Sequence, residues 1–177
     1  MVLVHGNGPQ VGMILLRIEA TKERIPPETL DILVAETQGS IGYLLSRSLR
    51  SEIPEREVAA FLTQVLVDPD DPGFASPTKP VGPFYAREAA DELIRSQGWK
   101  MRESPGRGWR RVVPSPRPQE IVELHTIKDA VGHGHLIIAG GGGGVPVARD
   151  EKGILRGIEA VIDKDLTACK LAVAIEA

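Results

Sequence analysis

The chain has 177 residues, 42% of them hydrophobic and 25% charged, a balance that is typical of one globular domain and excludes a wholly disordered chain. The net charge of −3 excludes a general attraction to nucleic acid or to an anionic membrane surface, so the expected partner is a small molecule. No apolar run approaches the ~20 residues of a membrane helix, the one cysteine cannot form an internal disulfide, and no secretory signal is visible, so a cytoplasmic protein is expected.

The first fifty residues predict a strand, a glycine loop and two helices. The aliphatic run Val2–Val4 predicts a strand that ends in the loop Gly6–Gly8. Apolar residues at helical spacing then predict a helix up to about Arg24. After the break at Pro26-Pro27, the same spacing predicts a second helix from Leu30 to about Ser51.

Two glycines inside the second predicted helix indicate close packing. Gly39 and Gly42 each cost up to ~1 kcal/mol relative to alanine in a helix interior, so we expect another backbone to approach this helix closely. The segment that follows, Glu57–Val67, is rich in valine, leucine, phenylalanine and threonine and predicts one buried strand.

Residues 68–118 differ in composition from the rest of the chain because they hold nine of its fourteen prolines. A short helix is predicted at Arg87–Gln97. We interpret this segment as a subdomain inserted into a single domain that spans residues 1–177. Its basic run, Gly106–Val113, is equally well explained as a solvated loop or as a functional cluster.

The last third of the chain predicts two helices around a buried strand. A helix is expected at Gln119–Val131, and the apolar run Leu136–Ala139 predicts a strand of a parallel sheet that is covered on both faces. Five glycines, Gly140–Gly144, follow directly. The last helix is expected to begin near Asp163. This order of elements favours a three-layer α/β architecture.

Both glycine loops are candidate anion sites because they follow strands. Glycine loops in this position can present free backbone N–H groups to a phosphate. Neither loop matches the P-loop or the dinucleotide-binding pattern, and a tight turn is the simpler explanation for either one alone. The four histidines and the cysteine show no metal-ligand spacing, so no metal site built from side chains is predicted.

Two lysines are candidates for binding phosphate. Lys164 lies between Asp163 and Asp165 at a predicted helix start, where the helix dipole favours anions. The alternative is a helix-capping Asp163 beside a solvated lysine. Lys79 follows Thr78 and lies between two prolines, which stiffen its backbone, although an ordinary surface lysine would look the same.

Taken together and in this order, several motifs resemble those of carbamate kinases, which are members of the amino acid kinase family. The motifs are His5-Gly6-Asn7-Gly8-Pro9-Gln10, Thr78-Lys79-Pro80, Gly140-Gly141-Gly142-Gly143-Gly144-Val145-Pro146 and Asp163-Lys164-Asp165. The resemblance implies a three-layer α/β/α sandwich of amino acid kinase type, with residues 68–118 as the protruding subdomain. It also implies the reversible transfer of a phosphoryl group from ATP to carbamate, which yields ADP and carbamoyl phosphate.

The resemblance also implies roles for individual residues. Lys164 would neutralise charge on the transferring group, Lys79 would reach the phosphates when the subdomain closes, and Asp163 would orient Lys164. The residues expected around the carbamate and the phosphoryl group are His5, Gly6, Asn7, Gly8, Gly141, Gly142 and Gly143. Mg²⁺ would be held through the phosphates of the nucleotide, and no general base is required because carbamate is already an anion.

Compared with carbamate kinases, the chain departs from the family pattern at both ends. Only four residues precede His5, and the nucleotide-binding elements expected after the last helix are absent, so we expect an incomplete domain that is inactive and poorly stable as given. The missing parts would leave the faces of Leu136–Ala139 uncovered. When complete, the protein is expected to form a homodimer and to act in arginine metabolism. Two alternatives stay open, namely a non-catalytic remnant that binds a phosphate-like anion or a partner chain, and a related kinase that acts on another carboxylate.

Overall fold

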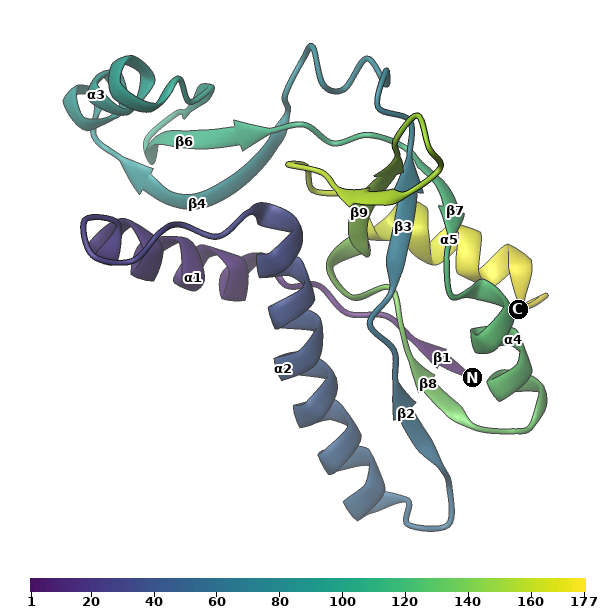
Figure 1. Cartoon of the computed structure of the whole chain (residues 1–177). Helices are drawn as coiled ribbons and strands as arrows, with labels where there is room; N and C mark the ends of the chain where they lie inside the picture. Colours follow the sequence, from purple (N-terminus) through teal and green to yellow (C-terminus); the bar gives the residue numbers. More distant parts are fainter.

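The structure is a computed structural model that describes all residues from 1 to 177 (Figure 1). Its helices are α1 (Gly8–Thr21), α2 (Leu30–Glu52), α3 (Arg87–Gln97), α4 (Leu124–Gly132) and α5 (Lys164–Ala174), with a 3₁₀ turn, η1, at Gly141–Gly143. Ten strands form three sheets. None of the helices combines the length and the apolar content that a membrane span requires.

The first sheet is parallel and lies between two layers of helices. It has the order β1 (Val2–Leu3), β8 (Leu136–Ile138), β2 (Val58–Ala60). Leu136 and Ile138 pack with the C-terminal half of α2, whereas Ile137 packs with side chains of α4 and α5. Both faces of β8 are therefore covered, and its three residues are 0–2% exposed. The expectation that this strand would be uncovered is wrong.

The second sheet is mixed and continues from the first. Its order is β10 (Leu155–Gly157), β9 (Val145–Arg149), β3 (Gln64–Val67), β7 (Pro118–Ile121), and only the pair β3–β9 is parallel. Val65 and Val67 of β3 join the same buried cluster as Ile137 of β8. One hydrophobic core therefore connects the two sheets.

Two predicted elements differ from the structure. The single strand expected at Glu57–Val67 is interrupted at residues 61–63, and its two halves, β2 and β3, belong to different sheets. The helix expected at Gln119–Val131 begins only at Leu124, because the residues before it pair with β3 as β7. In both places long-range pairing decides a structure that local composition does not.

The proline-rich segment carries its own antiparallel sheet. Its order is β4 (Lys79–Tyr85), β6 (Gly108–Val113), β5 (Met101–Ser104), and α3 connects β4 to β5. Figure 1 shows this sheet alongside α1, apart from the other two sheets. The basic run at residues 106–113 forms most of β6. We keep the predicted bounds of the subdomain, 68–118, as a proposal.

The close packing predicted for α2 occurs at one of its two glycines. A Cβ atom built on Gly42 would lie 3.0 Å from Cβ of Ala60 in β2, whereas one built on Gly39 would meet nothing within 4 Å. Gly42 therefore allows α2 to lie directly on the first sheet within this chain. Gly39 lies on the outer face of the helix.

Candidate functional site

The loop between β1 and α1 forms one wall of a cavity. β1 ends at Leu3, and the chain passes through His5, Gly6 and Asn7 before α1 begins at Gly8. Asn7 is 6% exposed, and its side-chain amide donates a hydrogen bond of 2.9 Å to Oγ1 of Thr37 on α2. This bond fixes the loop against the middle of α2.

Two backbone N–H groups of this first loop have no acceptor within the protein. The amides of Gly6 and Asn7 take part in none of the hydrogen bonds of the chain, and both residues line the cavity. The loop also lies at the N-terminus of α1, where the helix dipole favours negative charge. Free amides at such a position are a suitable binding site for an oxyanion.

The second glycine run is built differently from the expectation. The amides of Gly142, Gly143 and Gly144 donate to the carbonyls of His5, Gly140 and Gly141, respectively. The amide of Gly140 donates to Oγ1 of Thr63. These N–H groups are therefore occupied within the protein, and the idea that this run offers them to an anion is wrong for these four glycines.

Gly142 is the member of the run that lines the cavity. Its φ of +64° favours glycine, and a Cβ atom at this position would overlap the side chain of Asn7. Gly141 and Gly143 are buried behind it, and the hydroxyl of Thr167 donates to the Gly143 carbonyl at 2.8 Å. His5 supports the run through its carbonyl and does not line the cavity.

The start of α5 brings Lys164 to the cavity, and Asp163, which does not line the cavity, precedes it in the chain. Asp163 is the N-cap residue, and its Oδ1 accepts a hydrogen bond of 2.9 Å from the amide of Asp165. Lys164 is paired with the carboxylate of Asp165, which raises the pKa of the lysine. The aliphatic part of Lys164 lies beside Gly6, where a Cβ atom would be 3.7 Å from Cδ of the lysine.

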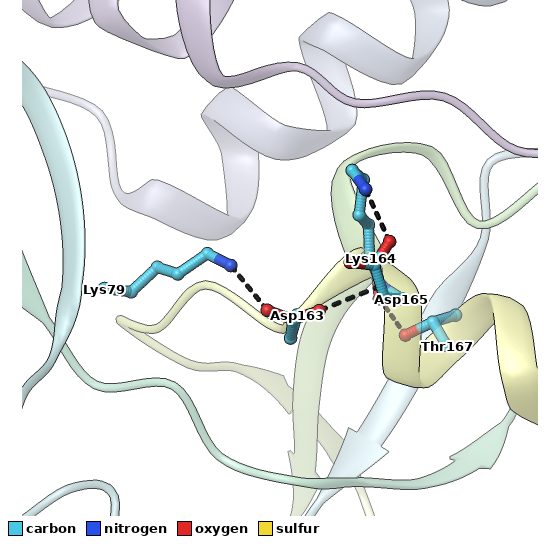
Figure 2. A network of polar contacts seen from close by, with 6 residues as sticks. Lys79, Asp163, Lys164, Asp165 and Thr167 are labelled. Carbon is cyan, nitrogen blue, oxygen red and sulfur yellow. Dashed lines mark hydrogen bonds and ion pairs between the residues drawn. The ribbon is translucent and has the colours of Figure 1, made fainter.

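Lys79, the first residue of β4, also lines the cavity. Its Nζ lies 2.8 Å from Oδ2 of Asp163, and the two side chains are 33% and 38% exposed. Figure 2 shows the side chain of Lys79 extended toward Asp163. The hydrogen bond from Lys79 is the largest cause of the lowered pKa of Asp163, followed by the one from the Asp165 amide. The structure thus pairs Asp163 with Lys79, whereas the sequence led us to expect that Asp163 would orient Lys164.

These residues line a cavity of about 210 Å³ that is partly open to solvent. Its charged groups are Lys79 and Lys164, and no carboxylate lines it. The remaining lining residues are small or apolar, namely Gly6, Asn7, Gly8, Val11, Pro80, Val81, Gly142, Val161 and Ile162. A small cavity with two cations and free backbone N–H groups is suited to a compact anion.

Four buried polar residues that support the site were not predicted from the sequence. Thr37 holds Asn7, Thr167 holds the Gly143 carbonyl, and Gln38 and Thr63 hold the beginning of the glycine run. Thr37 and Gln38 are adjacent polar residues on the otherwise apolar face of α2. Buried polar side chains require hydrogen-bond partners, so this adjacent pair on an apolar helix face was the feature of the sequence that could have indicated a supporting role.

Comparison with known proteins shows where this architecture occurs. The amino acid kinase family matches the whole chain, residues 1–177. A carbamate kinase of Pyrococcus horikoshii is 50% identical over 183 aligned residues, which cover 100% of this chain and 58% of that protein. The chain therefore spans a little more than half the length of such relatives.

Solved structures give the same picture. A structure from Aeropyrum pernix K1 superposes with a TM-score of 0.92 at 46% identity, over 99% of this chain and 58% of that one. The carbamate kinase of Giardia lamblia bound to AMP-PNP superposes with a TM-score of 0.88 at 42% identity, over 99% of this chain and 57% of that one.

Proposed function

The chain belongs to the amino acid kinase family, and we propose that it is the greater part of a carbamate kinase. The proposed reaction is the reversible transfer of the terminal phosphoryl group of ATP to carbamate. The observation that carries this proposal is the small cavity in which Lys79, Lys164 and the free amides of Gly6 and Asn7 face one anion-sized space.

The proposed chemistry uses positioning and charge rather than acid–base catalysis. An oxygen of carbamate attacks the terminal phosphorus of ATP, a new O–P bond forms, and the bond from this phosphorus to the bridging oxygen of ADP breaks. The attacking oxygen is already anionic, so no proton needs to be removed. The amides of Gly6 and Asn7 and the ammonium of Lys164 would stabilise the negative charge on the transferring group.

We propose that Lys79 binds a phosphate of the nucleotide and that Asp163 positions it. Lys79 begins β4, in the proposed subdomain, whereas its partner Asp163 caps α5, so the ion pair connects these two parts of the chain beside the cavity that Lys79 lines. We propose that Lys79 moves from Asp163 to a phosphate oxygen when the nucleotide binds. Asp163 would then hold the lysine near its working position in the free enzyme and would act as a positioning residue.

The lining of the cavity favours carbamate over an amino acid. An α-amino acid carries an ammonium group, which needs an acidic or carbonyl partner when it is buried. No carboxylate lines the cavity, and its apolar residues, Val11, Val81, Val161 and Ile162, would face that group. Carbamate has one charge, one planar head and no side chain. We therefore rank a kinase for a larger carboxylate below carbamate kinase.

The nucleotide and its metal belong to the proposal as substrates of the whole protein. Mg²⁺ would bind chiefly to phosphate oxygens and would help to neutralise their charge; the chain contains no group of three or more acidic, histidine or cysteine side chains suited to a metal ion. Because the chain covers 58% of the length of its relatives, we propose that ATP contacts depend mainly on the remaining part.

Assembly into a homodimer is a further part of the proposal. Ile32, Gly39 and Tyr43 lie on one face of α2, and the side chains of Ile32 and Tyr43 are 44% and 60% exposed. A symmetric pairing of this face would cover them. Gly42 is not part of it, because Gly42 packs on β2 within the chain. A cytoplasmic location and a role in arginine metabolism remain proposals that rest on the family.

The substrate assignment is tested by offering different acceptors to the protein extended to the length of its relatives. ATP consumption should be fast with ammonium and bicarbonate, which supply carbamate, and at background level with acetate, aspartate or glutamate. A preference for one of the amino acids would replace carbamate by that substrate. No phosphoryl transfer to any acceptor would favour the non-catalytic, anion-binding alternative.

A further inference from the structure

The side chain of Gln38 connects three segments that are far apart in the sequence. Its Nε2 donates to the carbonyl of Thr63 at 3.1 Å and to the carbonyl of Gly141 at 3.0 Å. Its Oε1 accepts a hydrogen bond of 2.7 Å from the amide of Thr63. Gln38 is 4% exposed and Thr63 is fully buried, so water does not compete for these bonds.

The hydrogen-bonding pattern requires a glutamine in one orientation. Both N–H groups of the side-chain amide meet carbonyl oxygens, and its oxygen meets an N–H group. A flipped amide would place its oxygen against two carbonyls and its NH₂ against the amide of Thr63. Asparagine is too short by one methylene, and glutamate cannot donate when it is ionised. Gln38 therefore fixes the Gly141 carbonyl relative to β3.

This fixed carbonyl determines where Gly142 lies. The peptide that carries the Gly141 carbonyl also carries the amide of Gly142, which donates to His5 at 2.8 Å. Gly142 lines the cavity, as Lys164 does, and lies against the side chain of Asn7. One peptide unit is thus held by α2 on one side and by the first loop on the other.

The neighbouring residue on α2 acts on the other loop. Thr37 is 1% exposed, accepts the hydrogen bond from Asn7 and donates its own hydroxyl proton to the carbonyl of Val34 at 2.8 Å. Adjacent residues of one rigid helix therefore hold both loops of the cavity. The distance between the loops is set by α2 before any ligand binds.

We infer that Gln38 is a positioning residue of the anion site, which holds Gly142 at the distance from Gly6 and Asn7 that suits a small oxyanion. This inference rests on the proposed function for the nature of the ligand. Gln38 does not touch the cavity itself, so its effect passes through the Gly141–Gly142 peptide. A role confined to general stability would instead leave the affinity of the folded chain for anions unchanged.

The inference is tested on the ¹⁵N-labelled chain with inorganic phosphate as the probe. The variants are Gln38→Glu, Gln38→Met and, as a matched control, Gln119→Glu on the exposed part of β7. Phosphate should shift the Gly6 and Asn7 amides of the wild-type chain. Gln38→Glu should weaken phosphate binding at least tenfold at pH 7, whereas Gln119→Glu should change it less than twofold.

Lowering the pH separates positioning from simple damage. A buried carboxyl group has a raised pKa, and once protonated it can donate one of the two lost hydrogen bonds. Relative to wild type at the same pH, Gln38→Glu should regain part of its phosphate affinity at pH 5, whereas Gln38→Met should not. The inference would be overturned if Gln38→Glu and Gln119→Glu changed the phosphate affinity, relative to wild type, by the same factor at pH 7 and at pH 5.

Two outcomes need separate readouts. If the wild-type chain binds no phosphate, the proposed anion site fails. The positioning of Gly142 by Gln38 is then tested by hydrogen exchange of the Gly142 amide, which should be at least tenfold faster in Gln38→Met than in the wild-type chain. Unchanged exchange would overturn it. If neither Gln38 variant folds, the inference is tested on the wild-type chain by hydrogen exchange of the Gln38 side-chain NH₂. This group should exchange as slowly as the buried backbone amides of α2, and fast exchange would refute its role.

Discussion

The ion pair between Lys79 and Asp163 allows a quantitative prediction. Its atoms are 2.8 Å apart, but the two side chains are 33% and 38% exposed, so water and salt screen the pair. At this distance two unit charges in water interact by about 1.5 kcal/mol, and ordering the side chains offsets part of this. We expect a coupling free energy of about 0.2–1 kcal/mol, in the range measured for exposed pairs.

The measurement is a double-mutant cycle with Lys79→Ala and Asp163→Asn. Asparagine is as good a helix cap as aspartate, so this substitution removes the charge of Asp163 and keeps its hydrogen bond to the Asp165 amide. Asp163→Ala is the matched contrast and should cost about 1 kcal/mol more, because the cap is lost as well. Urea denaturation of the four chains of the cycle gives the coupling free energy.

The pH and salt dependence of this coupling follows from the lowered pKa of Asp163. A carboxyl group whose folded-state pKa is lowered stabilises the fold above its ordinary pKa, and the contribution disappears as the pH falls through the lowered value. The coupling should thus be constant from pH 7 to pH 5 and shrink below about pH 4. It should also fall by half or more in 1 M salt. A coupling above 2 kcal/mol, or one insensitive to salt, would refute the picture of a screened surface pair.

Other predictions concern Lys164, which we propose to be catalytic, and three glycines. In the protein extended to the length of its relatives, Lys164→Ala should lower kcat/KM at least ~100-fold, which is the scale of losing one charge donor in the transition state. The control Lys170→Ala, on the same helix, should have little effect. A loss below tenfold for Lys164→Ala would exclude Lys164 from the mechanism. Gly39→Ala should stabilise the chain by up to ~1 kcal/mol in urea denaturation. Gly42→Ala should be at least about 1 kcal/mol less stable than Gly39→Ala, because the new Cβ atom would press on β2. Equal stabilities of the two variants would contradict this packing. Gly142→Ala should abolish phosphate binding measured by calorimetry, and retained affinity would show that the loops are not in contact as described.

The elements with a strong local signal were predicted well. The apolar spacing of α1 and α2, the glycine loop before Pro9 and the uninterrupted strand at Leu136–Ile138 all occur where the sequence places them. Helical periodicity and loops rich in glycine are properties of neighbouring residues, so a sequence displays them directly. The N-cap role of Asp163 was likewise foreseen as an alternative and is present.

The features that depend on distant partners could not be predicted. Asp163 and Lys79 are 84 positions apart, and nothing in the spacing of the D-K-D motif indicates that its first carboxylate pairs with a lysine of β4. The break between β2 and β3 similarly depends on Thr63, whose backbone bonds to Gln38 instead of continuing a strand. In the second glycine run, the amide of Gly142 donates to His5 and that of Gly140 to Thr63, and only the folded chain creates these two contacts.

The measurement that tests the central claim most directly is phosphoryl transfer from carbamoyl phosphate to ADP, followed by ³¹P NMR. The protein extended to the length of its relatives should convert the two substrates into ATP and carbamate in the presence of Mg²⁺. The same protein with Lys164→Ala should leave the rate near that of spontaneous carbamoyl phosphate breakdown, with ADP unchanged. No ATP from the wild-type protein, or equal rates for the two proteins, would contradict the assignment of this cavity as the site of phosphoryl transfer.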